Sequence, residues 1–120
     1  MVKGKGTDHL QPLRSAIVVF RVTRMSDAPI GFEWNEEKAE ANLWKHNIPF
    51  TEATTVFDDP NCLIMDDQEH SIIEARFIIL GRSIVNRLLL VIHCDRNENI
   101  RIISARPATS TEKRLYERGL

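Results

Sequence analysis

Alternating blocks of apolar and polar residues cover the C-terminal two thirds of this 120-residue chain. Short apolar runs bounded by polar breaks are typical of strands. Four such runs, at about residues 62–65, 75–82, 87–94 and 100–105, are joined by connections short enough for an antiparallel meander. The last three runs each carry arginine, and a buried guanidinium needs an anionic partner.

A helical pattern precedes these runs. Asn35 can cap a helix that begins with Glu36 and Glu37 and ends at Asn47, a residue that tolerates the left-handed conformation. The helical period places a polar stripe beside a more apolar one. The polar stripe contains Asn35, Lys38, Asn42 and Lys45, and the apolar stripe contains Ala39, Leu43 and His46.

Two more helices complete the pattern. One is predicted over residues 51–57, with Ala53, Val56 and Phe57 toward the core, and one over 111–118, capped by Thr109 or Ser110. The predicted fold class is therefore α+β, with two N-terminal helices, a four-stranded antiparallel meander and a C-terminal helix.

The first 30 residues differ in character from the rest. They are mostly polar, with one isolated apolar run at residues 16–22, and Met25 is a candidate second start. We expect 1–30 to be a leader, either mostly mobile or adding one edge strand, and 31–120 to be the folded domain.

Composition narrows the class of protein. The chain is 42% hydrophobic and 28% charged, which is ordinary for a soluble globular domain. Its longest apolar runs fall far short of the ~20 residues that span a bilayer. Cys62 and Cys94 have no metal-ligand spacing, so we expect a cytoplasmic protein with two reduced, buried thiols and no metal.

Charge is unevenly distributed along the chain. Residues 33–74 hold eleven acids and two bases, whereas residues 76–118 hold nine bases and four acids. The overall charge of −1 thus conceals a sequence that predicts a basic half able to bind a polyanion, or an acidic protein that mimics one. The alternative is that these arginines lie on solvated strand faces.

Several segments match a known family closely. They are residues 32–50, which read FEWNEEKAEANLWKHNIPF, residues 53–60 with their Phe-Asp-Asp-Pro end, residues 76–82, and residues 100–106, which read IRIISAR. Together they make the region from about 32 to 118 closely resemble the BrnT family, small ribonuclease toxins of bacterial type II toxin–antitoxin modules. Asn47 and Pro107 depart from the family pattern, which usually has Gly and a second basic residue there.

The resemblance implies a RelE-like fold and a metal-independent endoribonuclease that inhibits translation, with no cofactor. It also implies neutralisation by a cognate ribbon-helix-helix (BrnA-like) antitoxin, in a complex with two copies of each protein. Operator DNA would be bound only through the antitoxin. The competing hypothesis is that the chain is a non-catalytic module of the same fold, which binds RNA or protein.

Such cleavage requires deprotonation of the 2′-hydroxyl, stabilisation of charge on the phosphorus and protonation of the leaving oxygen. Arg76 and Arg106 are the first candidates for the phosphate, because a guanidinium fork binds two oxygens. The candidates for proton transfer are Lys45 with His46, and His93. The candidates for RNA binding are Trp34, Lys38, Arg82, Arg101 and Tyr116, with Glu112 as a further auxiliary. The alternatives for Trp34, His46 and His93 are packing roles in the core.

Overall fold

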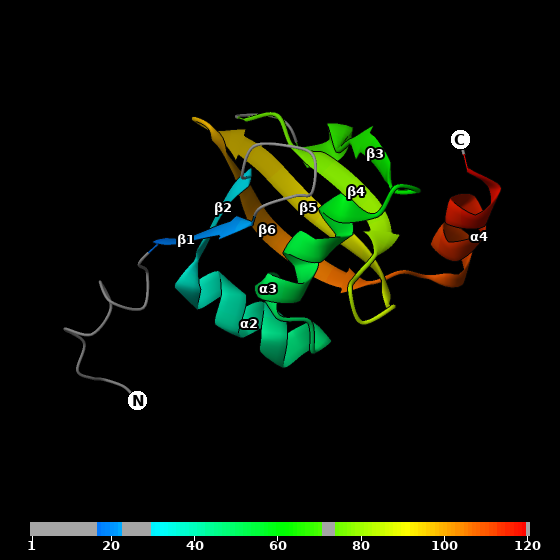
Figure 1. Cartoon of the computed structure of the whole chain (residues 1–120), viewed down its shortest axis with the longest axis horizontal. Helices are drawn as coiled ribbons and strands as arrows, with labels where there is room; N and C mark the ends of the chain where they lie inside the picture. Colours follow the sequence, from blue (N-terminus) through cyan, green and yellow to red (C-terminus); the bar gives the residue numbers. More distant parts are fainter. Residues whose placement is uncertain (1–16, 23–29, 71–73, 120) are drawn as a thin grey trace.

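The computed structural model describes residues 17–22, 30–70 and 74–119, which form one mixed sheet with helices (Figure 1). The strands are β1 (Ile17–Val22), β2 (Ile30–Asn35), β3 (Leu63–Asp66), β4 (Phe77–Arg82), β5 (Leu88–Arg96) and β6 (Asn99–Pro107). The helices are α2 (Glu36–His46), α3 (Phe50–Ala53) and α4 (Ser110–Arg118), with 3₁₀ turns at Thr54–Asp58 and Gln68–His70. The α+β class is therefore confirmed.

The sheet differs from the predicted one in size and in direction. It has six strands in the order β1-β2-β6-β5-β4-β3, and β2 runs parallel to β6 while all other neighbours are antiparallel. The prediction of four antiparallel strands preceded by two helices was therefore wrong, because strands β1 and β2 come before α2. A parallel pairing joins residues far apart in sequence, so local periodicity carries no sign of it.

Strand β1 is the edge of the sheet beside β2. All six of its residues pair with β2, from Ile17 opposite Asn35 to Val22 opposite Ile30. The expectations for residues 1–16 and 23–29 lie outside the described residues, and the domain boundary at residue 31 stays a prediction.

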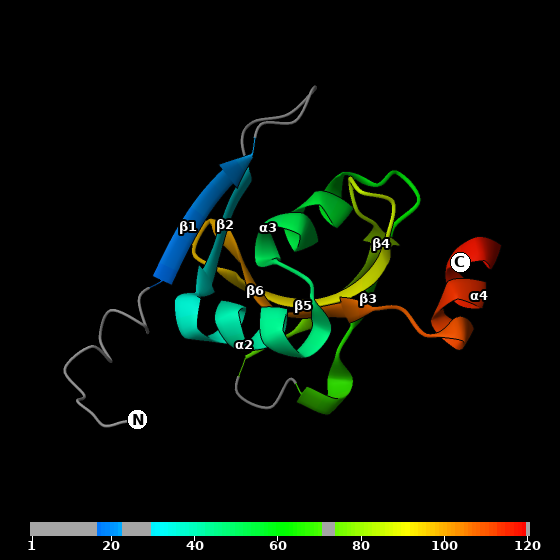
Figure 2. The same cartoon turned by 90° about the horizontal axis from the view of Figure 1, so that it is seen from below.

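Helix α3 covers one face of the sheet, and α2 lies along the edge of β6, where Asn42 bonds to the backbone of Ala105 (Figure 1, Figure 2). Helix α2 begins where the Asn35 side chain accepts a hydrogen bond from the Lys38 N–H, and it ends at Asn47, whose φ is +58°. Both ends agree with the prediction. The core beneath these helices includes Phe32, Trp34, Ile48, Phe50, Ala53, Val56, Ile79, Leu89, Val91, Ile102 and Ala105.

The second helix is shorter than predicted. It changes to a 3₁₀ turn at Thr54, and the hydroxyls of Thr54 and Thr55 donate to the carbonyls of Thr51 and Glu52. Hydroxyl groups that bond to nearby carbonyls compete with the regular helical pattern. This competition explains the tighter turn.

Asn42 belongs to the predicted polar stripe of α2, yet the structure buries it. Its side chain is buried, accepts a hydrogen bond from the Ala105 N–H at 3.0 Å and donates to the carbonyls of Ala105 and Ile48 at 2.9 and 3.1 Å. The Asn42 amide thus bonds to the backbone of Ala105, which follows the part of β6 that pairs with β2. Leu43, expected on the buried side, is 46% exposed.

Helix α4 lies at the end of the molecule opposite β1 (Figure 1). Thr109 and Glu112 form a capping box at its start, and none of its residues is buried. No helix in the described ranges is long and apolar enough to cross a membrane.

Candidate active site

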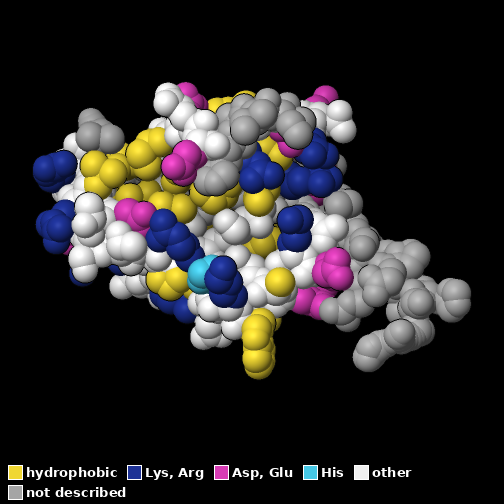
Figure 3. Space-filling model, turned by 180° about the vertical axis from the view of Figure 1, so that it is seen from behind, with side chains coloured by type: hydrophobic (Ala, Val, Ile, Leu, Met, Phe, Trp, Pro, Cys, Tyr) yellow, Lys and Arg dark blue, Asp and Glu magenta, His cyan; other side chains and the backbone are white. Residues whose placement is uncertain are grey.

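The face of the sheet opposite α3 carries an open cavity of about 410 Å³. Successive strand residues point to opposite faces, so the neighbours of the core residues Ile79, Val91 and Ala105 face this side. The cavity is lined by apolar Ile78, Leu90, Ile92 and Ile103, and by polar Asp67, Glu69, Arg76, Ser104, Arg106 and Glu112. Figure 3 shows hydrophobic side chains gathered on this side of the molecule among charged ones.

Arg76 and Arg106 both line this cavity. Arg76 directly precedes β4, and its carbonyl accepts a hydrogen bond from the Asp67 N–H at 2.9 Å. Arg106 lies on β6 opposite Leu90 of β5. The antiparallel meander therefore brings the two arginines into one site, although they are thirty residues apart in sequence.

Arg106 is held by Glu112 of α4. Nη1 and Nη2 of Arg106 donate to Oε1 and Oε2 of Glu112 at 2.9 and 2.8 Å, and Oε1 also accepts from the Thr109 N–H at 2.8 Å. The hydrogen bonds from Arg106 hold the pKa of Glu112 below its ordinary value. Both groups are therefore charged at neutral pH.

The cavity lining contains three carboxylates, from Asp67, Glu69 and Glu112, against two guanidinium groups. Such a site can take an anion only at the arginines. Among the described residues, no group of three His, Cys, Asp or Glu side chains is arranged to hold a metal ion.

Lys45 and His46 lie at the end of α2, and Lys38 lies nearer its start. Asn42 fixes α2 against Ala105, the residue before Arg106, and His46 follows Asn42 by about one helical turn. Lys38 and Lys45 are exposed and His46 is half-buried. These three side chains are therefore attached to the helix that packs against the strand carrying Arg106.

His93 lies on the other face of the sheet. Its ring contacts Phe57 and Phe77, with centroids 4.9 and 5.8 Å away, and it is 5% exposed. Among the described residues, neither ring nitrogen of His93 has a hydrogen-bond partner, and burial lowers the pKa of His93 to about 4. This placement fits the packing alternative.

Trp34 is also a core residue, 5% exposed, with its ring edge-on to Phe50 at 5.9 Å between centroids. Arg101, expected to bind RNA, instead pairs with Glu33 of β2, which also accepts from Asn99. Neither side chain lines the cavity.

Tyr116 and Arg82 join α4 to the rest of the domain. The Tyr116 hydroxyl donates to Oδ2 of Asp59 at 2.6 Å, and the Arg82 guanidinium lies 5.7 Å from the centre of the Tyr116 ring. Burial and the bond to Asp59 raise the pKa of Tyr116 to about 12, so it stays protonated. These contacts fit anchoring of the helix.

Pairing cancels part of the contrast in charge between the two halves of the sequence. Arg87, Arg96 and Arg101 pair with Glu52, Glu74 and Glu33 from the acidic half, and Arg106 pairs with Glu112. Sequence reasoning missed these pairs because each joins distant segments, apart from Arg106 and Glu112. For that pair the Thr-x-x-Glu capping signature was a visible signal.

Comparisons with known proteins agree with this architecture. The family model described as "Ribonuclease toxin, BrnT, of type II toxin-antitoxin system" matches residues 34–112. The crystal structure of the ribonuclease toxin BrnT from Brucella abortus is similar, with a TM-score of 0.51 and 19% identity, over 64% of this chain and 94% of that one. No curated protein sequence matches. The family model spans well over half of the chain, so this protein belongs to the BrnT family of ribonuclease toxins of type II toxin–antitoxin systems.

Proposed function

We propose that this chain is a metal-independent endoribonuclease whose active site is the open cavity between Arg76 and Arg106. The observation that carries the proposal is that these two arginines, one directly before β4 and one on β6, line one cavity of about 410 Å³. Two guanidinium groups can hold the scissile phosphate and stabilise the charge that develops on it. The apolar strand residues between them offer a surface for a base.

In the proposed reaction the ribose 2′-oxygen attacks the neighbouring phosphorus, a bond forms between them, and the bond from phosphorus to the 5′-oxygen breaks. The products are a 2′,3′-cyclic phosphate and a 5′-hydroxyl. One protein group accepts the 2′-proton and another donates a proton to the 5′-oxygen.

We assign the proton-transfer roles to Lys45 and His46, which do not line the cavity but belong to α2, the helix that Asn42 joins to Ala105 directly beside Arg106. Lys38 on the same helix and Arg82 beside α4 are proposed RNA contacts. His93, Trp34 and Arg101 are left out of the proposed site, since the first two are buried in the core and the third is occupied by Glu33. Tyr116 is proposed as an anchor of α4.

The test is cleavage of a defined RNA by the purified chain in EDTA, with the product ends identified by mass spectrometry. We expect cleavage with cyclic phosphate ends. Activity that disappears in EDTA and returns with magnesium would reject the mechanism, and a folded protein without cleavage in either condition would favour the non-catalytic module.

We further propose that the chain inhibits translation in the cytoplasm and is neutralised by a ribbon-helix-helix (BrnA-like) antitoxin. Ile78, Ile92 and Ile103 remain partly exposed on the open face, and apolar contacts of this kind supply lasting affinity. Inducible expression with and without the antitoxin gene tests neutralisation. Light scattering on the co-purified complex tests the proposed two-to-two stoichiometry, which a stable one-to-one heterodimer would contradict.

A further inference from the structure

Arg106 cannot bind a phosphate through its Nη1 and Nη2 atoms while its present partner stays in place. Both of its terminal nitrogens already donate to the two carboxylate oxygens of Glu112, and Nη1 also donates to the Pro107 carbonyl at 3.2 Å. A carboxylate and a phosphate use the same edge of the guanidinium fork. Glu112 therefore occupies the Nη1–Nη2 edge, one of the two edges through which Arg106 can bind a substrate phosphate with two hydrogen bonds.

The helix that carries Glu112 is only lightly attached. None of the side chains of α4 is buried, so the helix contributes little apolar surface to the core. Its other described links are the hydrogen bond from Tyr116 to Asp59 and the Arg82 guanidinium near the Tyr116 ring. Polar links of this kind at a surface cost little to break, because water replaces the lost hydrogen bonds.

The family match ends at Glu112, the third residue of α4. Most of this helix therefore lies beyond the segment that the family model describes. The contact between Glu112 and Arg106 lies at the boundary between the matched domain and the C-terminal helix.

We propose that Glu112 masks the active site: its carboxylate acts as an internal anion on Arg106, and an RNA phosphate must displace it, with a shift of α4, before it can bind. This inference rests on the proposed function, since it concerns regulation of the same site. While Glu112 is bound to Arg106, the affinity for RNA is lowered. A partner that holds α4 away from Arg106 would restore that affinity.

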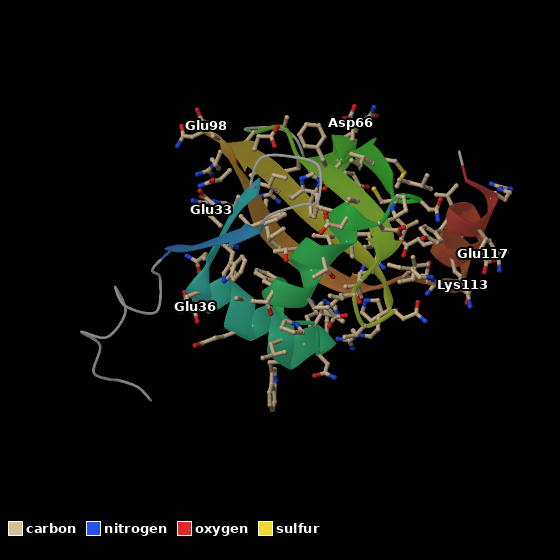
Figure 4. The ribbon with its side chains drawn as sticks, in the orientation of Figure 1. Glu33, Glu36, Asp66, Glu98, Lys113 and Glu117 are labelled. Atoms are coloured by element: carbon tan, nitrogen blue, oxygen red, sulfur yellow. The ribbon has the colours of Figure 1, made fainter. Side chains whose placement is uncertain are left out.

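The test compares two charge-neutralising substitutions on the same helix, Glu112→Gln and Glu117→Gln. Gln at position 112 keeps the capping box, because its side-chain oxygen can still accept from the Thr109 N–H. Glu117 is exposed and pairs with no described residue. Figure 4 shows it on α4, at the end of the molecule opposite Glu36 of α2. It therefore controls for the change in net charge.

The probe is a short RNA with 2′-O-methyl riboses, which has no 2′-hydroxyl and cannot be cleaved. Its binding to the full chain is measured by fluorescence anisotropy, with circular dichroism to verify folding. We expect Glu112→Gln to tighten binding about three- to tenfold beyond Glu117→Gln, because a partly exposed pair is weak and each tenfold is a modest free-energy change. Adding Arg106→Ala to Glu112→Gln should abolish the gain.

Equal affinities of Glu112→Gln and Glu117→Gln, or weaker binding by Glu112→Gln, would overturn the mask. Unchanged affinity together with slower cleavage of ordinary RNA would also overturn it, and would identify Glu112 as a catalytic residue. Because the probe reports binding alone, tighter binding without any cleavage by the wild-type chain would support the mask while rejecting the proposed ribonuclease mechanism.

Discussion

The two faces of strands β4 to β6 both carry apolar side chains, but on one face these form the core and on the other they line a cavity. On the covered face, Ile79, Val91 and Ala105 are fully buried on the side of α3. On the open face, Ile78 and Ile92 remain partly exposed around a cavity. Strand alternation produces this contrast, so one stretch of sequence encodes both a core and a candidate site.

Each side has a two-pronged arginine–carboxylate pair. Arg87 donates through Nε and Nη2 to Glu52, which is nearly buried and also accepts from the Ser83 hydroxyl at 2.7 Å. Arg106 donates through Nη1 and Nη2 to Glu112, but this pair borders the cavity. The comparison teaches that burial and neighbours, rather than the pair itself, decide whether an arginine supports the fold or remains available to a ligand.

The largest effect should follow from loss of the open-face arginines. We expect Arg106→Ala and Arg76→Ala to reduce cleavage by about 30- to 1000-fold, because each removes a charge-assisted contact worth roughly 2–4 kcal/mol at the transition state. Thermal stability should change little. The measurement is the single-turnover rate on a defined RNA.

Arg114→Ala is the matched control for these variants, since Arg114 is an exposed arginine of α4 outside the cavity. Wild-type rates for both Arg76→Ala and Arg106→Ala would contradict the assignment. Unfolded variants would instead place the open-face arginines in the same structural role as Arg87.

A large effect on stability is expected from the covered-face pair. Arg87→Met leaves Glu52 unpaired at a site where it is 9% exposed, and we expect the free energy of unfolding to fall by about 2–3 kcal/mol. Urea denaturation measures this change. The cleavage rate per folded molecule should stay near the wild-type value.

Arg96→Met is the comparison for that experiment, because the pair between Arg96 and Glu74 is much more exposed. We expect little loss of stability there. Equal losses in Arg87→Met and Arg96→Met would show that the burial of Glu52 does not matter.

Acid should weaken the covered face through His93. Its pKa is about 4 in the folded protein and about 6.5 when unfolded, so the unfolded state binds the proton more readily. The contribution of neutral His93 is fully present above pH 6.5 and is lost as pH falls toward 4, a change of about 2–3 kcal/mol.

The Leu variant separates this effect from that of the carboxylates. Urea midpoints of wild type and His93→Leu should converge or cross as pH is lowered from 7 to 4.5, since Leu cannot be protonated. Parallel pH curves for the two proteins would show that His93 does not control the acid response.

The smallest effect concerns the backbone at the end of α2. Asn47 has φ of +58°, and Asn47→Gly should raise the free energy of unfolding by about 0.5 kcal/mol, because glycine adopts this conformation without a side-chain clash. The Asn47 carbonyl that accepts from Arg87 is retained. A lower urea midpoint would mean that the Asn47 side chain contributes more than its conformation.

The sequence by itself determined the local elements. Asn35 and Asn47 predicted both ends of α2, and apolar runs located β3 to β6 to within a few residues, since caps and strand periodicity depend on neighbouring residues. Only the tertiary structure decided the parallel pairing of β2 with β6, the burial of Asn42 and the partner of each arginine. These features join segments far apart along the chain, and no local pattern records which distant group satisfies a polar side chain.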